Sequence, residues 1–361
     1  MVSMVSLDSG YAVMKGVQWD GEELRNINFQ AIAERCQEKH YKEIKHGLKV
    51  NGQYYALQES GRLIDSTKII EPDKKVFHGS EGQHAQKCWA LECLKIENGH
   101  HPRLITALPY SDSKDEQLIE SIKSNKVFEW ENKNGEKRKV SFEEVVVYPQ
   151  GVGALRLFQA VTGIEPKKVS LIDIGSITLD IVSLRRFRNE PHSYNVGASG
   201  SVREGAGGYS LFSDLNRRMK DVSGLTEITE SYHDISDRVE TKDFNITAPG
   251  GVIKNVESLY DDSRKEFTLN TLVKSKKIVG NEWENTDAFI LTGGIASCLD
   301  IGQWECKGRT YITDNWANSL GQLHANLNEE HQKKLKEKLV ALANIKFLNA
   351  NGDLEEVKIL K

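Results

Sequence analysis

Apolar positions recur along the chain with two different periods, and each period predicts a different kind of element. Short apolar runs bounded by polar residues predict strands at 104–108, 145–148, 169–173, 179–184 and 288–291. Apolar positions at helical spacing predict helices at 80–95, 113–123, 152–162, 209–222, 252–276 and 329–344. Strands that alternate with helices in this manner indicate the α/β class.

Turn residues add hairpins to the first half of the chain. An alternating stretch at 47–68 contains the turn pairs Asn51-Gly52 and Ser60-Gly61, which predict hairpins, and a further hairpin is predicted at 126–142 around Asn134-Gly135. Ser113, with Glu116 three residues later, predicts the cap of the helix at 113–123. The first half is therefore expected to carry β structure beyond its main strands.

One design occurs twice, once in each half of the chain. An apolar strand, an Asp-x-Gly turn and a second strand follow one another at 6–15 and again at 171–180. The turns themselves are Asp8-Ser9-Gly10 and Asp173-Ile174-Gly175. A repeat of this kind implies two similar subdomains that face one another.

Both turns carry residue types that are suited to binding a nucleoside triphosphate. Glycine at the tip lets backbone N–H groups approach phosphate oxygens without a side chain between them. Asp8 and Asp173 would repel a phosphate, so they are expected to hold Mg²⁺, mostly through water. Lys15 would reach the β- and γ-phosphates as a point charge. Either turn alone is more commonly an ordinary β-turn, but the pair after two buried strands favours phosphate binding.

Size and composition agree with an ordinary folded protein. The chain has 361 residues, which exceeds the usual size of one domain, so two domains are expected. Hydrophobic residues make up 39% and charged residues 28%, a balance typical of folded rather than disordered chains. The net charge of −4 gives the chain no electrostatic reason to bind nucleic acid directly.

The cysteines and the apolar runs indicate in which cell compartment the protein is expected. The five cysteines include no CxxC pair, which argues against disulfides and a zinc site and fits a reducing cytoplasm. No apolar stretch approaches the roughly 20 residues of a membrane span, and the first residues do not resemble a signal peptide. We therefore expect a cytoplasmic protein without membrane association.

The two turns resemble the phosphate-1 and phosphate-2 motifs of the actin-like ATPases, a superfamily that also includes sugar kinases and heat-shock-type ATPases. Residues 148–154, Tyr-Pro-Gln-Gly-Val-Gly-Ala, resemble the first interdomain connection of bacterial actin-like proteins, and residues 291–296, Leu-Thr-Gly-Gly-Ile-Ala, resemble their adenosine motif. Residues 314–321 resemble the Ala-Asn-x-x-Gly segment of ParM/StbA-type plasmid segregation proteins. The resemblance covers nearly the whole chain, with the motifs in order.

The resemblance implies roles for particular residues. Gln150 would orient the water that attacks the γ-phosphate, while Asp8 and Asp173 would take part in catalysis by holding Mg²⁺. The remaining nucleotide-binding residues that it implies are Gly10, Tyr11, Lys15, Gly175, Ser176, Thr178, Gly293, Gly294 and Ile295. Tyr11 is bulky where many relatives have a small or polar residue, so the amides that contact phosphate in the first turn stay open. The nucleotide is expected to be ATP, with GTP as the alternative.

Two of these interpretations have ordinary structural alternatives. Gln150 is also explained as a loop residue beside a proline, and Gly293-Gly294 as a turn or helix entry. Asp180 would complete the metal site only if its side chain lies on the same side as Asp173. The glycines at 205–208 precede a predicted helix and would support the base pocket or bind an anion.

The implied fold is that of the actin-like ATPases, with two ribonuclease-H-like domains, each on a five-stranded core, inserted subdomains and an interdomain nucleotide cleft. Domain I is expected at 1–160, with a hairpin-rich insert near 20–75 and the interdomain connection at 148–154. Domain II is expected at 161–361, with an insert near 205–285 and a C-terminal helix that returns toward domain I.

The function that the resemblance implies is a filament-forming, Mg²⁺-dependent ATPase that drives plasmid DNA segregation. Its partners would be further copies of itself and a DNA-binding adaptor protein, with no direct contact to nucleic acid. The alternative is a non-polymerising member of the same superfamily, either a small-molecule kinase or a chaperone-type ATPase.

Overall fold

The chain divides into two compact units, which are described separately. A computed structural model describes residues 3–10, 12–58, 81–187, 190–203, 205–223, 232–247, 253–313 and 316–357. Unit 1 comprises Met1–Val161 and Trp316–Ala343, and unit 2 comprises Thr162–Asn315 and Asn344–Lys361. The segment Trp316–Ala343, which contains the last long helix, is part of unit 1. The predicted turn at Ser60-Gly61 lies outside the described residues.

The main sheet of unit 1 has the strand order β10-β7-β1-β2-β3. Its strands are β1 (Met4–Ser9), β2 (Val13–Trp19), β3 (Leu24–Gln30), β7 (Arg103–Leu108) and β10 (Val145–Pro149). β2 runs antiparallel to both β1 and β3, whereas β1, β7 and β10 are parallel to one another. This arrangement is the five-stranded ribonuclease-H-like core that was predicted.

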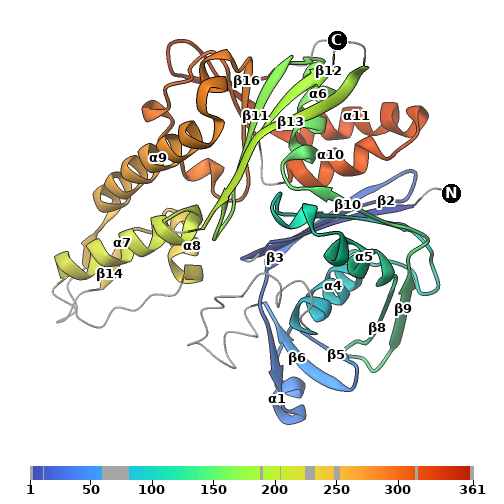
Figure 1. Ribbon diagram of the computed structural model, residues 1–361. Helices are drawn as coiled ribbons and strands as arrows, with labels where there is room; N and C mark the ends of the chain where they lie inside the picture. The colour runs from blue at the N-terminus through green and yellow to red at the C-terminus, as the bar shows by residue number, and fades with distance from the viewer. Residues whose placement is uncertain are drawn as a thin grey trace. The chain divides into compact units, whose positions relative to one another are not determined.

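Helices cover both faces of this sheet. Figure 1 shows α4 (Glu81–Cys93) and α5 (Glu116–Ser124) on one face, with α10 (Ala317–Ala325) and α11 (Glu329–Ala343) on the other. The contact between α4 and the sheet is apolar, because Leu7 and Met14 of the sheet pack in one cluster with Cys88 and Leu91 of the helix. Helix α6 (Val152–Thr162) follows β10 directly.

The helix at 113–123 has a different cap from the predicted one. Ser113 lies in a short 3-10 turn, η1 (Asp112–Lys114), and α5 begins at Glu116. Asp115 is the N-cap, since its side chain accepts a hydrogen bond from the amide of Leu118. The prediction of Ser113 was therefore wrong, because a second capping residue lay two positions further along.

A second sheet in unit 1 joins the two predicted hairpins. Its order is β4-β6-β5-β8-β9. The strands are β4 (Ala33–Cys36), β5 (Gly47–Val50), β6 (Gln53–Leu57), β8 (Val127–Glu131) and β9 (Lys137–Ser141), with the short helix α1 (Glu38–Glu43) between β4 and β5. Residues 24–30, at the start of the insert predicted near 20–75, pair with β2 in the main sheet.

The large sheet of unit 2 repeats the order of the first and then extends it. Its order is β13-β12-β11-β16-β17-β18-β19. The strands are β11 (Lys168–Ile174), β12 (Leu179–Phe187), β13 (Glu190–Val202), β16 (Ala288–Thr292), β17 (Thr310–Ile312), β18 (Lys346–Leu348) and β19 (Leu354–Glu356). The expectation of five strands was incomplete here, because β18 and β19 pair onto the β17 edge, where Leu348 is fully buried.

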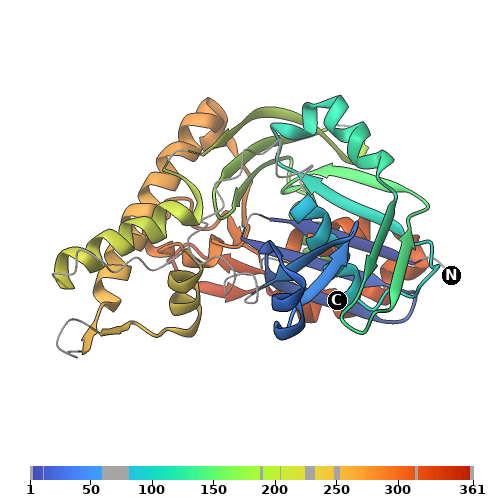
Figure 2. The ribbon, with the colours of Figure 1, turned by 90° about the horizontal axis from the view of Figure 1, so that it is seen from below.

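Two long helices lie beside each other in unit 2. Figures 1 and 2 both show α7 (Gly207–Ser223) next to α9 (Glu257–Val279), with α8 (Tyr232–Thr241) close to α7. Asp214 of α7 accepts hydrogen bonds from Ser263 Oγ at 2.7 Å and Arg218 Nε at 2.6 Å. Burial alone would raise the pKa of Asp214, but these hydrogen bonds lower it, so the carboxylate stays charged between the helices.

Helix α9 begins later than predicted. The expected helix started at 252, but Ile253–Asn255 forms the strand β15, paired with β14 (Asn245–Thr247). The side chain of Asn255 then accepts a hydrogen bond from the amide of Glu257, the first residue of α9. Residues 253–255, which the helical spacing had assigned to the helix, therefore form a strand because they pair with β14.

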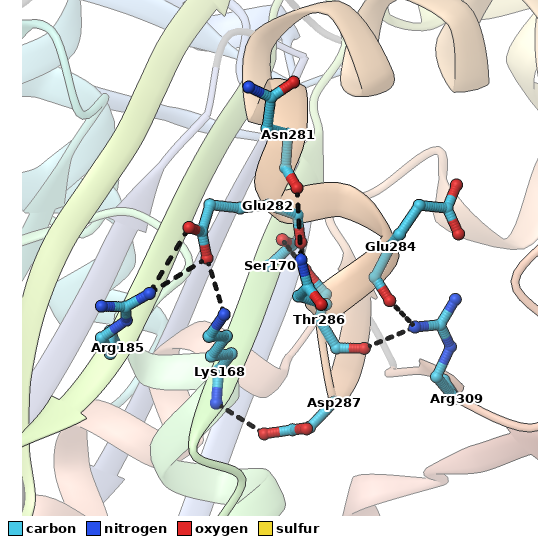
Figure 3. A network of polar contacts seen from close by, with 10 residues as sticks. Lys168, Ser170, Arg185, Asn281, Glu282, Glu284, Thr286, Asp287 and Arg309 are labelled. Carbon is cyan, nitrogen blue, oxygen red and sulfur yellow. Dashed lines mark hydrogen bonds and ion pairs between the residues drawn. The ribbon is translucent and has the colours of Figure 1, made fainter.

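A network of polar contacts lies at the end of the unit 2 sheet where β11 begins (Figure 3). Glu282, in the 3-10 turn η3 (Gly280–Asn285), forms ion pairs with Lys168 at 3.1 Å and Arg185 at 3.4 Å. Asp287 accepts a hydrogen bond from the backbone amide of Lys168 at 2.8 Å, and Arg309 donates to the carbonyl of Thr286. These contacts hold the chain between α9 and β16 at the opposite end of β11 from Asp173.

Candidate functional site

In unit 1 the first Asp-x-Gly turn joins two central strands. Asp8 and Lys15 lie directly opposite each other in the β1–β2 register, so both side chains point to the same face of the sheet. They are only 7% and 6% exposed. Within the described part of the chain, Asp8 Oδ1 has no hydrogen-bond partner. A buried, unpaired carboxylate oxygen is costly unless a ligand satisfies it, so Asp8 is suited to a hydrated metal ion.

Glycine is required at the tip of this turn. A Cβ atom at Gly10 would lie 2.7 Å from the carbonyl oxygen of Val13, which is closer than real Cβ contacts. The tight backbone therefore presents its amides without a side chain, as phosphate binding needs. Tyr11, the bulky residue in the turn, lies outside the described residues.

The second turn, in unit 2, has the same register. Asp173 pairs with Asp180 across β11 and β12, seven positions further along, as Asp8 pairs with Lys15. The two carboxylates therefore lie on the same face of the sheet. This is the condition under which Asp180 was expected to complete the metal site. Thr178 Oγ1 donates to Asp180 Oδ2 at 2.8 Å, while Asp180 Oδ1 has no hydrogen-bond partner among the described residues.

The start of α7 supports this second turn. The amides of Gly208 and Tyr209 donate to the carbonyl oxygens of Gly175 and Ser176, at 3.0 Å and 2.6 Å. Gly207 has φ +71°, and a Cβ there would lie within 2.9 Å of the backbone of the turn. Because these amides at the helix start are used by protein carbonyls, they hold the turn in place rather than bind an anion.

The Gly293-Gly294-Ile295 segment packs against the same strand end. Ile295 N donates to the carbonyl of Ile174 at 3.1 Å. Gly293 has φ +95°, and a Cβ there would lie 2.5 Å from Asp173 Oδ1, so only glycine fits. A Cβ at Gly294 would meet no atom within 4 Å. The structure thus brings the segment at 293–295 together with Asp173, Gly175, Ser176 and Thr178 in unit 2.

Gln150 lies in unit 1 at the end of β10. Its backbone amide donates to the carbonyl of Leu108 at 2.7 Å, which continues the pairing of β10 with β7. The residue is half-buried and is followed by Gly151, which has φ +84°. Asn318 belongs to the Ala-Asn-x-x-Gly segment singled out in the sequence, but no sequence pattern indicated its contact with this loop. Its side chain accepts hydrogen bonds from Gly151 N and Ala154 N.

The donor set limits what kind of metal site is available. Among the described residues, no group of three or more His, Cys, Asp or Glu side chains is placed to hold a metal ion. Burial raises the pKa of Cys93 to about 12 and that of Cys306 to about 11, so both thiols are protonated at neutral pH. One or two carboxylates fit Mg²⁺, which keeps several waters and takes further oxygens from phosphates.

The predicted residues thus divide between the two units. Asp8, Gly10, Lys15 and Gln150 lie in unit 1, and those at 173–178 and 293–295 lie in unit 2. No helix in the described part of the chain has the length and apolar character of a membrane span.

The comparison with known protein families concerns unit 1. Residues 6–153 match the family described as the N-terminal domain of actin-like proteins. No curated protein sequence is similar enough to this chain to count as a match.

Solved structures match over most of the chain. The chain in a solved structure of a 15-stranded ParM filament from Clostridium botulinum is 19% identical to this chain, with a TM-score of 0.70. The match covers 92% of this chain and 99% of that chain. An archaeal actin homologue in complex with ADP is 16% identical with a TM-score of 0.69, covering 90% and 99%. ParM of Bacillus thuringiensis with ATP is 14% identical with a TM-score of 0.62, covering 91% and 99%. At these identities the similarity shows the fold, which confirms the predicted actin-like architecture.

Proposed function

We propose that this chain, which has the actin-like fold and whose residues 6–153 match an actin-like N-terminal domain, is a filament-forming ATPase. The observation that carries the proposal is the duplicated hairpin with equal register. In each unit a buried Asp lies at the end of the first central strand, beside a glycine turn. Two such hairpins suit one nucleotide whose phosphates and Mg²⁺ need amides, a cation and carboxylates.

Each side chain takes a separate role in the proposed reaction. Lys15 neutralises the β- and γ-phosphates, while Asp8 and Asp173 would hold a Mg²⁺ ion, which would offset charge on the phosphates. Gln150 orients the attacking water, because a neutral amide positions well but is a poor base. The glycines at 293 and 294 let the backbone pack against the base or ribose.

Filament formation is the second part of the proposal. Its support is the similarity to a solved structure described as a ParM filament. Plasmid segregation would then need a separate DNA-binding adaptor, since the chain itself has a net charge of −4 and would weakly repel DNA. The cytoplasm is the compartment in which such a filament would act.

The catalytic part is tested by single-turnover hydrolysis of ATP with Mg²⁺. Gln150→Ala should bind ATP as the wild type does but hydrolyse it about 100-fold more slowly, because the water is no longer oriented. Asp173→Ala should lose its dependence on Mg²⁺ together with most of its activity. Full turnover by Gln150→Ala would remove this residue from the mechanism.

The assembly part is tested by light scattering and electron microscopy at micromolar protein concentration. ATP with Mg²⁺ should raise the scattering and produce filaments, and the signal should decay as ADP accumulates. If scattering stays flat with ATP while hydrolysis proceeds, the chain is a non-polymerising enzyme of the same fold, and transfer of phosphate to small-molecule acceptors becomes the next assay.

A further inference from the structure

The loop that carries Gln150 lacks a cap of its own. Helix α6 starts at Val152, and Gly151 occupies the position just before it. A residue in this position normally supplies a side-chain oxygen that accepts hydrogen bonds from amides of the first turn. Gly151 has no side chain, so an oxygen from elsewhere must satisfy these amides.

Asn318 of α10 supplies that oxygen from a point far along the chain. Its Oδ1 accepts from Gly151 N at 3.0 Å and from Ala154 N at 3.3 Å. These are the amides at the cap position and three residues later, the same two that a capping box satisfies. Asn318 is only 4% exposed, so water competes little for these hydrogen bonds.

Two glycines let Asn318 come this close. A Cβ at Gly153 would lie 2.1 Å from the carbonyl oxygen of Asn318, and a Cβ at Gly321 would lie 1.8 Å from the carbonyl oxygen of Gly153. The backbones of α6 and α10 therefore touch where they cross. Without this contact the short side chain of Asn318 would not reach the amides at the start of α6.

The backbone on both sides of the Gln150 side chain is thereby held. The amide of Gln150 is bonded to β7 through Leu108, and the next amide, that of Gly151, is bonded to Asn318. We propose that Asn318 is a positioning residue for Gln150, which sets the direction in which this side chain leaves the loop. This inference rests on the proposed role of Gln150 in hydrolysis.

The test is a double-mutant cycle in the full-length protein, with single-turnover ATP hydrolysis measured at a concentration below assembly. Asn318→Ala should bind a fluorescent ATP analogue as tightly as the wild type but hydrolyse ATP about 10- to 100-fold more slowly, since misplacement by about 1 Å has effects of this size. In a Gln150→Ala background the same change should cost nothing further, because the group that it positions is absent. Asn318→Asp, which keeps the accepting oxygen, should restore most of the rate.

Asn328 offers a matched control. It also caps a helix of unit 1, since its Oδ1 accepts from His331 N at 2.9 Å at the start of α11. Asn328→Ala should lower the melting temperature through the lost cap but leave the hydrolysis rate unchanged. If Asn318→Ala does not fold, Asn318→Ser, with a shorter acceptor, should give an intermediate rate in the same cycle.

The outcomes separate the inference from the proposed function. Full activity of Asn318→Ala beside a slow Gln150→Ala overturns the inference alone. So does an equal loss in the wild-type and Gln150→Ala backgrounds, or an equal loss in Asn328→Ala, because each indicates general destabilisation. Full activity of Gln150→Ala overturns the proposed mechanism itself.

Discussion

At the scale of single residues, the two hairpins differ at one equivalent position. Lys15 lies opposite Asp8 in unit 1, whereas Asp180 lies opposite Asp173 in unit 2. Because the register is the same, each partner lies on the same face as its Asp. In the proposed function, the first hairpin would therefore offer a cation to a phosphate, and the second would offer another carboxylate to a metal ion.

Replacement of Lys15 tests the first of these roles. Lys15→Met keeps the length of the buried side chain but removes its charge, so ATP affinity should fall by about 10- to 100-fold, as the loss of a charge-assisted hydrogen bond predicts. Affinity for AMP, which lacks the outer phosphates, should change little. Isothermal titration with each nucleotide measures this, with the surface variant Lys123→Met as the control. Equal losses for ATP and AMP would contradict the assignment.

The burial of His84 predicts that stability depends on pH. It stacks on Phe128 with ring centroids 5.0 Å apart, and burial lowers its pKa below the ordinary value. The unfolded chain then takes up a proton near pH 6.5 that the folded chain refuses, so the free energy of unfolding falls as the pH drops through this value.

The variant His84→Phe should weaken that dependence. Phenylalanine can stack on Phe128 but does not titrate, so denaturant unfolding between about pH 5 and 7 should show a shallower slope than in the wild type. Some slope should remain, because burial also lowers the pKa of His324. An unchanged slope would show that His84 does not contribute.

At the scale of elements, the C-terminal hairpin β18–β19 completes the sheet of unit 2. β18 pairs antiparallel with β17, and Leu348 at the end of β18 joins the main hydrophobic cluster of that unit. Without β18, β17 would be an exposed edge strand of three residues. The last strands therefore contribute to stability although they lie outside the ribonuclease-H-like core.

Two leucines that pair with each other in this hairpin differ in burial, so replacing each one tests how much burial contributes to stability. Leu348→Ala should lower the free energy of unfolding by about 2–5 kcal/mol, because it leaves a cavity at a fully buried position. Leu354, its partner in the register, is 42% exposed, and Leu354→Ala should cost less than about 1 kcal/mol. Urea unfolding followed by far-UV circular dichroism gives both values. Equal costs would show that Leu348 is not part of the core.

At the scale of the whole molecule, the chain passes between the units three times. It enters unit 2 at Thr162, returns to unit 1 at Trp316 and enters unit 2 again at Asn344. Neither unit is therefore a continuous stretch of sequence, and the proposed nucleotide contacts are distributed over both.

Hydrogen exchange with mass spectrometry tests whether one nucleotide uses both hairpins. ATP with Mg²⁺ should slow amide exchange at 8–15, 173–178 and 293–295 together, because a ligand stabilises every part that it contacts. The same pattern should occur in Gln150→Ala, in which binding is retained. Slower exchange in only one hairpin would reject the proposal that both hold the same nucleotide.

Much of the fold and of the candidate site was readable from local sequence. The repeated Asp-x-Gly turns, the strands that flank them and helix α6 were predicted because apolar spacing and glycine turns act over a few residues. The helix start at 257 and the cap at Asp115 were missed, since neighbouring alternatives compete within one or two residues.

The sequence by itself determined the two hairpins and their residue types, because backbone geometry at Gly10 and the alternation of a strand depend only on adjacent positions. Only the tertiary structure decided that Asp180 shares a face with Asp173, that Gly293 packs on the end of β11 and that Asn318 caps α6. Each of these depends on pairing or close contact between segments far apart in the chain. No local pattern encodes such contacts, since the same glycine or asparagine would satisfy many other partners.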